Sequence, residues 1–119
     1  MGCSIGSIWE VSVHHIKMER KTMPTYISLE KFTSQGVKEI KDGPARVEAY
    51  RALCKKMGAE LKSFHLTMGR YDIITIVDAP DDATMARISL AVSTLGNVSM
   101  ETLRAFNESE YRDIIAGLP

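Results

Sequence analysis

Residues 67–77 read TMGRYDIITIV, a glycine in a short polar break followed by an almost unbroken apolar, β-branched run. Glycine adopts positive φ without steric strain, so Gly69 suits the tight turn of a hairpin. A strand that is covered on both faces reads as a continuous apolar run, as residues 73–77 do. The stretch therefore predicts a hairpin that leads into a strand buried on both sides, with Asp72 at its start.

The bulk composition indicates one ordinary globular domain. The chain has 119 residues, of which 45% are apolar, and its 15 basic side chains balance 15 acidic ones. This balance offers no electrostatic attraction for nucleic acid, and no apolar run approaches the roughly 18 residues of a membrane span. We therefore expect neither a nucleic-acid partner nor a membrane. The two cysteines, Cys3 and Cys54, are typical of a reduced, cytoplasmic chain.

The pattern divides the chain into an extension over residues 1–22 and a domain over residues 23–119. The extension shows no sustained periodicity, so we expect it to be flexible or loosely docked. Its adjacent His14 and His15 would point apart on a strand, and no other ligand types cluster near them, so no metal site is expected. No sequence motif for a cofactor is present, and we expect none to bind.

Within residues 23–119 the periodicities predict a β-α-β-β-α-β order and a short last helix. The first helix should be interrupted at Asp42-Gly43-Pro44, because proline cannot continue the helical ladder. Asn107 followed by Glu110 has the spacing of a capping box, which marks the start of the last helix. The expected strands cover residues 25–32, 59–68, 71–79 and 98–106, and the expected helices begin after Thr33, Asp81 or Asp82, and Asn107.

This order is that of the ferredoxin-like α+β fold, an antiparallel four-stranded sheet in the order 4-1-3-2 with both long helices on one face. We assign Ile27, Leu29, Leu103 and Ala105 to the helix-covered face. The opposite set mixes aromatic, aliphatic, hydroxyl and charged residues, and an exposed sheet face of that kind marks an interface. A second subunit is the simplest cover, which predicts a homodimer or higher oligomer. The opposite set comprises Tyr26, Ser28, Glu30, Phe32, Val98, Met100, Thr102, Arg104 and Phe106.

Three blocks in order and at matching spacing resemble the GYD domain family of small bacterial and archaeal proteins. They are MPTYISLEKFTSQGVKEIKD, LKSFHLTMGRYDIITIVDAPDD and LGNVSMETLRAF, and the likeness extends from Met23 to the end of the chain. The naming motif of the family corresponds to Gly69, Tyr71 and Asp72. One departure is His65, where the family pattern leads us to expect an aromatic residue such as Tyr or Trp.

The resemblance implies a dimeric α+β barrel, in which two ferredoxin-like sheets pack face to face. That group of proteins includes small monooxygenases, stress-responsive barrel proteins and the effector-binding domains of feast/famine regulators. Because the family is largely uncharacterised, its name implies a fold and an assembly and leaves the activity open.

Five residues are candidates for a small-molecule site, and four of them also have a structural explanation. Tyr71 could stack on a ligand or be a half-buried edge aromatic, and Asp72 could anchor a ligand or accept backbone N–H groups. His65 could act in acid–base chemistry or lie on the surface. Arg104 could bind a ligand carboxylate or form a cross-strand ion pair with Glu30. The candidate pocket residues are Tyr26, His65, Tyr71, Asp72 and Arg104.

Three functions are compatible with these residues. The first is a homodimeric small-molecule-binding or accessory module without catalytic machinery, which we favour because no nucleophile–base–acid set is visible. The second is a cofactor-free monooxygenase or isomerase with His65 as its base. The third is a purely structural or interaction dimer, and fold class alone does not distinguish the three.

Overall fold

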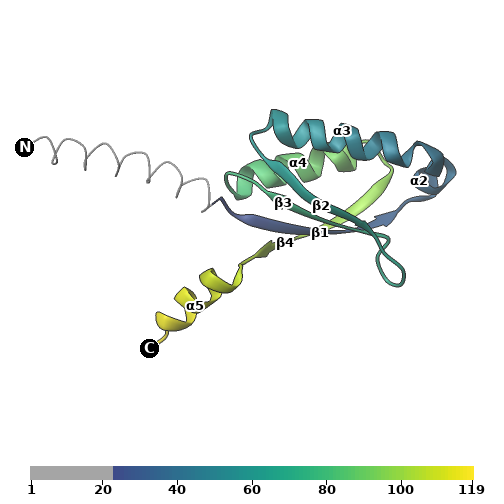
Figure 1. The fold of residues 1–119 in the computed structure, drawn as a ribbon. Helices are drawn as coiled ribbons and strands as arrows, with labels where there is room; N and C mark the ends of the chain where they lie inside the picture. Colours follow the sequence, from purple (N-terminus) through teal and green to yellow (C-terminus); the bar gives the residue numbers. More distant parts are fainter. Residues whose placement is uncertain (1–22) are drawn as a thin grey trace, which may run out of the picture.

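The computed structural model describes residues 23–119, and the expected extension over residues 1–22 lies outside that range. The four strands form one antiparallel sheet in the order β2-β3-β1-β4, which confirms the predicted ferredoxin-like α+β topology. Helices α3 and α4 cover one face of this sheet, whereas α5 lies on the other side (Figure 1). The elements are β1 (Thr25–Phe32), α2 (Ser34–Lys38), the 3-10 turn η1 (Ile40–Asp42), α3 (Gly43–Lys56), β2 (Glu60–Leu66), β3 (Ile73–Asp78), α4 (Asp82–Thr94), β4 (Val98–Ala105) and α5 (Glu108–Ala116).

The first helical segment is broken where the sequence predicts it. Thr33 caps α2 by accepting the N–H of Gly36, and α3 starts afresh at Gly43 with Pro44 in its first turn. Proline is well placed there, because the first N–H groups of a helix have no partner within the helix. Val37 of α2 is 57% exposed, since the break takes α2 off the axis of α3 (Figure 1).

The core lies between the sheet and the two long helices. Cys54 of α3 and Met85 and Ile88 of α4 are fully or almost fully buried against Tyr26 and Val77 of the sheet. Asp81 caps α4 by accepting the N–H of Thr84, which resolves the two capping candidates in favour of Asp81. Burial of these side chains removes apolar surface from water and fixes the helices over the sheet.

The face assignment made from the sequence is wrong. Tyr26, Ser28 and Glu30 of β1 are buried beneath the helices, whereas Ile27 and Leu29 lie on the other face and are partly exposed. Side chains along a strand alternate between the two faces of the sheet, so the sequence divides them into two sets. The alternation does not indicate which of the two sets the helices cover. We assigned the more apolar set to the helices, and the chain places the set with the hydroxyl and carboxyl groups there.

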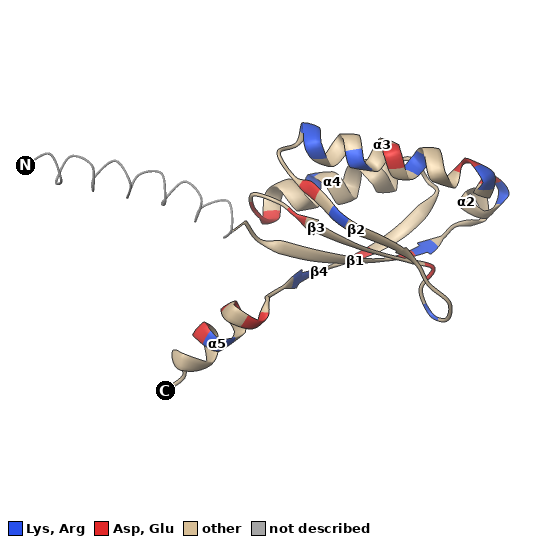
Figure 2. Ribbon diagram, in the orientation of Figure 1, with Lys and Arg blue, Asp and Glu red and all other residues tan. Residues whose placement is uncertain are grey.

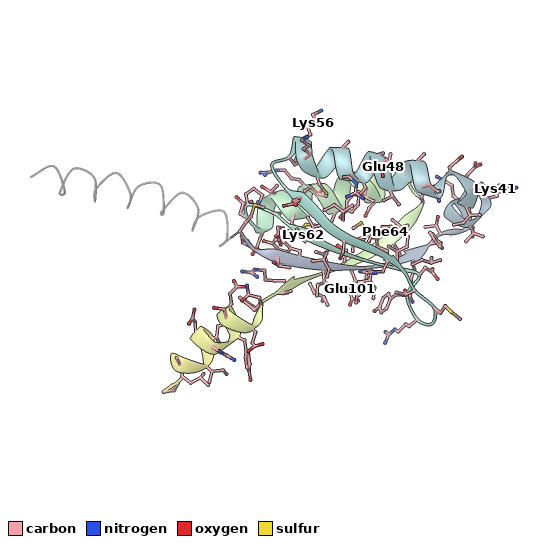
Figure 3. The ribbon with its side chains drawn as sticks, viewed as in Figure 1. Lys41, Glu48, Lys56, Lys62, Phe64 and Glu101 are labelled. Carbon is pink, nitrogen blue, oxygen red and sulfur yellow. The ribbon has the colours of Figure 1, made fainter. Side chains whose placement is uncertain are left out.

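The open face of the sheet, defined as the face not covered by α3 and α4, carries an apolar band. Ile27 of β1 pairs with Ile76 of β3 on one side and with Leu103 of β4 on the other. Glu101 lies at the margin of this face, pointing away from the helices (Figure 3). The residues of the apolar band are Ile27, Leu29, Ile74, Ile76 and Leu103.

Charged side chains are distributed unevenly over the described part of the chain. Figure 2 shows them along α2 and α3, at the ends of strands and on both sides of α5.

Across residues 23–119, no helix has both the length and the apolar character that crossing a bilayer requires.

Candidate functional site

The turn that carries Gly69, Tyr71 and Asp72, here called the GYD turn, connects β2 to β3 and is longer than the two-residue gap between the expected strands 59–68 and 71–79. β2 ends at Leu66 and β3 begins at Ile73, so six residues make the connection. Gly69 has φ +107°, the left-handed conformation expected for it. The pairing of β2 with β3 also shifts at a bulge between Leu61 and Ser63, which the sequence did not reveal.

Asp72 ties this turn to the end of β1. Its carboxylate accepts the backbone N–H of Phe32 at 2.9 Å, and its own N–H donates to the Glu30 carbonyl at 2.8 Å. The Asp72 carbonyl accepts the N–H of Thr67 at 2.7 Å, which closes the turn. The carboxylate therefore accepts a backbone N–H, as the structural explanation for Asp72 predicts. It braces the hairpin against the central strand.

The braced hairpin presents apolar side chains to solvent at its tip. Met68 is 98% exposed and Leu66 is 71% exposed. The ring of Tyr71 is half-buried at the base of the turn, with the Lys31 amine and the Arg70 guanidinium each 5.6 Å from its centroid. Cations at this distance from a ring face are weakly attracted to it, so they help to hold Tyr71 in place.

A cleft opens at the opposite end of β1, between α4 and the edge of the sheet. Tyr26 of β1 and Arg104 of β4 are direct partners in the strand register, and both line the cleft. The cleft has a volume of about 470 Å³, within the range of small-molecule sites. Its lining consists of Tyr26, Asp82, Met85, Ala86, Ser89, Leu90, Thr102 and Arg104.

The cleft contains a phenol, a carboxylate and a guanidinium, those of Tyr26, Asp82 and Arg104. The Tyr26 hydroxyl donates to the Asp82 carboxylate. Burial, together with this bond, raises the pKa of Tyr26 to about 12, so the phenol stays protonated. The Arg104 guanidinium lies 4.3 Å from the ring centroid of Phe106 and 3.8 Å from a carboxylate oxygen of Glu110. A guanidinium beside an apolar floor is suited to a carboxylate ligand.

Glu30 is buried beneath the helices, and the ion pair expected between Glu30 and Arg104 is not formed. Arg104 lies opposite Tyr26, whereas Glu30 lies opposite Met100, further along β1. Glu30 is only 6% exposed and accepts one hydrogen bond, from the Thr75 hydroxyl at 3.3 Å. Burial is the main cause that raises the pKa of Glu30 to about 7.

The carboxyl of Glu30 belongs to a polar row on the covered face of the sheet. Ser28 and Thr75, which pair across β1 and β3, are fully buried. The hydroxyl of Tyr50 is also buried and has no hydrogen-bond partner within residues 23–119. This row makes the covered face unusually polar for a core. Buried polar groups normally have hydrogen-bond partners, and the Tyr50 hydroxyl is an exception among the described residues.

The structure brings together two of the five candidate pocket residues. Tyr26 and Arg104 share the cleft, and Tyr71 and Asp72 lie at the opposite end of β1. His65 is exposed on β2, where it pairs with Ile74 of the open face. The five therefore form two separate groups and one isolated histidine, rather than the single pocket that the sequence suggested.

Sequence reasoning missed the contribution of α4 to the cleft. Asp82, Met85 and Ser89 follow one another at spacings of three and four, so they share one side of α4. That spacing was a usable signal, but in the sequence Asp82 was considered only as a cap of the helix. Among residues 23–119, no group of three histidine, cysteine or carboxylate side chains is arranged to hold a metal ion.

The motif and fold agree with a comparison against known families. The profile of the GYD domain matches residues 26–115, most of the chain. The chain belongs to the GYD domain family. A relative from Thermus thermophilus is 33% identical to this GYD protein over 97 residues, which cover 81% of this chain and 99% of the relative. That relative is named as a glutamine synthetase and cystathionine beta-lyase binding protein.

Solved structures with a similar fold include two regulators from Mycobacterium tuberculosis. A feast or famine regulatory protein complexed with L-methionine matches with a TM-score of 0.56 and 15% identity over 71% of this chain. A leucine response regulatory protein matches with a TM-score of 0.54 and the same identity and coverage. This GYD protein spans 51% of the length of each regulator, and at this identity the likeness concerns the fold alone.

Proposed function

We propose that this GYD protein is a non-catalytic accessory module, a cytoplasmic homodimer that binds a larger partner protein. The observation that carries the proposal is the relative from Thermus thermophilus, which is named for binding two enzymes. Because 99% of that relative aligns with this chain, its named property concerns a domain of the same extent. The partner class proposed here is therefore a metabolic enzyme of the kind that name identifies.

The apolar band of the open face supports the homodimer. Ile27, Ile76 and Leu103 form a continuous row across three strands, and no element within residues 23–119 covers them. Exposed apolar surface of this extent marks an interaction site. A second copy presents the same band, and two such bands can pack about a two-fold axis into the α+β barrel that the resemblance implies.

The tip of the GYD hairpin is the surface that we propose for the enzyme. It projects beyond the sheet at the end away from α5 (Figure 1), and Met68 at its tip is 98% exposed in the single chain. Met68 is almost fully exposed on a turn that Asp72 braces, which limits the entropy lost when it is buried. A single apolar side chain on a rigid support is a suitable anchor for a pocket on a partner.

The proposal is tested by calorimetric titration with purified glutamine synthetase and cystathionine β-lyase from the organism that supplies this chain. At least one enzyme is expected to bind, and Met68→Asp is expected to weaken that binding by roughly tenfold or more. Val37→Asp places the same charge on another exposed apolar residue, in α2, and should leave the affinity unchanged. Absence of binding by both enzymes at about 100 µM would contradict the proposal.

A second candidate function is the binding of a small carboxylate in the cleft between α4 and β4. The pairing of Arg104 with Tyr26 above an apolar floor favours it. A panel of small carboxylates should include one that raises the melting temperature of the wild type and not that of Arg104→Gln. Arg87→Gln, which changes an exposed arginine on α4, serves as the control. If no compound stabilises the wild type, this candidate is rejected.

A further inference from the structure

Helix α5 is well formed although it packs on nothing within residues 23–119. The Asn107 side chain accepts the Glu110 N–H at 2.8 Å, and the Glu110 carboxylate accepts the Asn107 N–H at 2.9 Å. This reciprocal capping box is the one predicted from the sequence, and it satisfies two N–H groups that a helix start leaves free. α5 makes no extended contact with any other described element.

The apolar side of α5 is therefore exposed to solvent. Its residues follow the spacing i, i+3, i+4 and i+7, which places them on one side of the helix. An apolar stripe of this regularity is typical of a helix that packs against a surface. The apolar side of α5 consists of Tyr111, Ile114 and Ile115, continued by Leu118 just beyond the end of the helix; they are 59%, 48%, 46% and 61% exposed.

The direction of α5 is held by local contacts. Only Phe106 and Asn107 separate it from β4, and Asn107 is engaged in the capping box. The Arg104 guanidinium contacts the ring of Phe106 and lies 3.8 Å from the carboxylate of Glu110, so it links β4 to the first turn of α5. To fold back onto its own sheet, α5 would have to break these contacts. Its apolar side therefore has no partner within residues 23–119.

The position of α5 points to a second copy of this chain. α5 lies on the side of the sheet opposite α3 and α4, which is the side of the open face (Figure 1). A copy that packs on the apolar band enters the space beside α5. One partner can therefore cover both the apolar band of the open face and the apolar side of α5.

The area of the sheet supports the same occupant. Four strands of six to eight residues, spaced about 4.8 Å apart, present roughly 450 Å² in projection. A stable interface buries about 800 Å² on each partner. A nine-residue helix is about 14 Å long and 10 Å wide, so giving and receiving one adds roughly 250 to 300 Å² per subunit. The sheet with two exchanged helices therefore reaches the size that a stable dimer needs.

We propose that α5 is an exchanged arm that packs its apolar side against the second copy of this chain. This inference rests on the homodimer of the proposed function, and it adds a second pair of contacts to the sheet interface. Each subunit gives its own α5 and receives that of its partner, because a two-fold axis makes the contacts reciprocal.

Sedimentation equilibrium of full-length variants tests the arm. Ile115→Asp places a charge on the apolar side of α5, and Ala116→Asp places the same charge one residue later, on its other side. Both changes have a similar effect on the helix itself, because they lie in the same turn. Ile115→Asp is expected to raise the dimer dissociation constant by roughly 100-fold, and Ala116→Asp by less than about threefold. Equal effects of the two changes would overturn the proposal.

The location of α5 is measured directly in a dimer assembled from two differently labelled copies. Isotope-filtered NOE spectra should show contacts from the Ile115 methyl groups of one copy to protons of the other copy. A stable dimer without such contacts overturns the arm and leaves the proposed homodimer intact. A wild type that stays monomeric removes the homodimer and the arm together, whereas loss of enzyme binding by Met68→Asp bears only on the proposed function.

Discussion

The two faces of the sheet differ in the side chains that they carry and in what covers them. The face under α3 and α4 buries the polar Ser28, Glu30 and Thr75 among apolar side chains, whereas Ile27 and Ile76 on the open face are only partly buried and have no helix over them. An apolar face of a sheet is normally covered by a further layer of structure. In the proposed dimer, the second copy supplies that layer and makes the open face a second core.

The two faces also contribute to stability in different ways. Removal of the apolar band from water stabilises an association, so its contribution depends on protein concentration. The polar row of the covered face acts within one chain, and its contribution depends on pH through Glu30. Variants on the two faces should therefore change different measurements.

The largest effect is expected from a charge at the centre of the open face. Ile76→Asp places a carboxylate opposite Ile27, where the proposed dimer leaves it no water and no partner. We expect the dimer dissociation constant, measured by sedimentation equilibrium, to rise by about 1000-fold, or about 4 kcal/mol. Ala52→Asp adds the same charge to an exposed position of α3, on the helix side of the sheet, and should change the constant little. Similar values for both variants would show that the centre of the open face is not buried.

The covered face is tested through the pH dependence of stability. Burial raises the pKa of Glu30 from its ordinary value of 4.5 to about 7, so the folded state holds this proton more tightly than the unfolded state. The stabilisation is full below pH 4.5 and is lost as the pH rises through 7, by roughly 3 kcal/mol in all.

Glu30→Gln should remove this loss, because glutamine keeps the shape and hydrogen-bonding capacity without a charge. Urea unfolding at fixed protein concentration should show the variant more stable than the wild type at pH 8 and about equal at pH 4.5. Glu48→Gln, at an exposed position of α3, should leave the pH profile unchanged. A wild type whose stability does not fall over this range would contradict the burial of an ionisable Glu30.

The GYD turn should contribute a smaller, local effect. Asp72→Ala removes the acceptor of the Phe32 N–H and should lower the free energy of unfolding by about 2 kcal/mol. Asp72→Asn should lower it less, because an amide oxygen can still accept that bond. Asp42→Ala is a suitable control, since the side chain of Asp42 makes no capping hydrogen bond. If Asp72→Ala and Asp42→Ala unfold at the same urea concentration, the carboxylate does not brace the hairpin.

The smallest effect is expected at the cap of α5. Asn107→Ala removes one half of the capping box and should cost about 1 kcal/mol of helix stability. Circular dichroism should show a small loss of helix, and sedimentation should show a dimer weakened by roughly fivefold. Ser109→Ala lies in the same turn and leaves the box intact. A dimer equally stable in both variants would indicate that α5 is not part of the interface.

The elements and their order were predictable because their signals are local. The capping box at Asn107, the break at Gly43-Pro44 and the positive φ of Gly69 each depend on a few neighbouring residues. Topology followed from them, since a β-α-β-β-α-β order has few compatible sheet arrangements. The family motif then agreed with the profile match over residues 26–115.

The covered face and the site were not predictable in the same way. The alternation along β1 separates Tyr26 and Glu30 from Ile27 without stating which set the helices cover. The bulge after Leu61 and the six-residue turn have no clear local signal, and both affect where His65 lies. The cleft is lined by Arg104 of β4 and by residues of α4, which are distant from Arg104 in the sequence. That Asp82 lines the cleft could therefore be seen only in the folded structure.

In the proposed dimer, two copies of this chain pack together over the open face of the sheet. Sedimentation velocity of the full-length wild type at micromolar concentration measures this association. We expect one species with twice the mass of the 13.2 kDa chain. A single species with the mass of one chain at that concentration would contradict it.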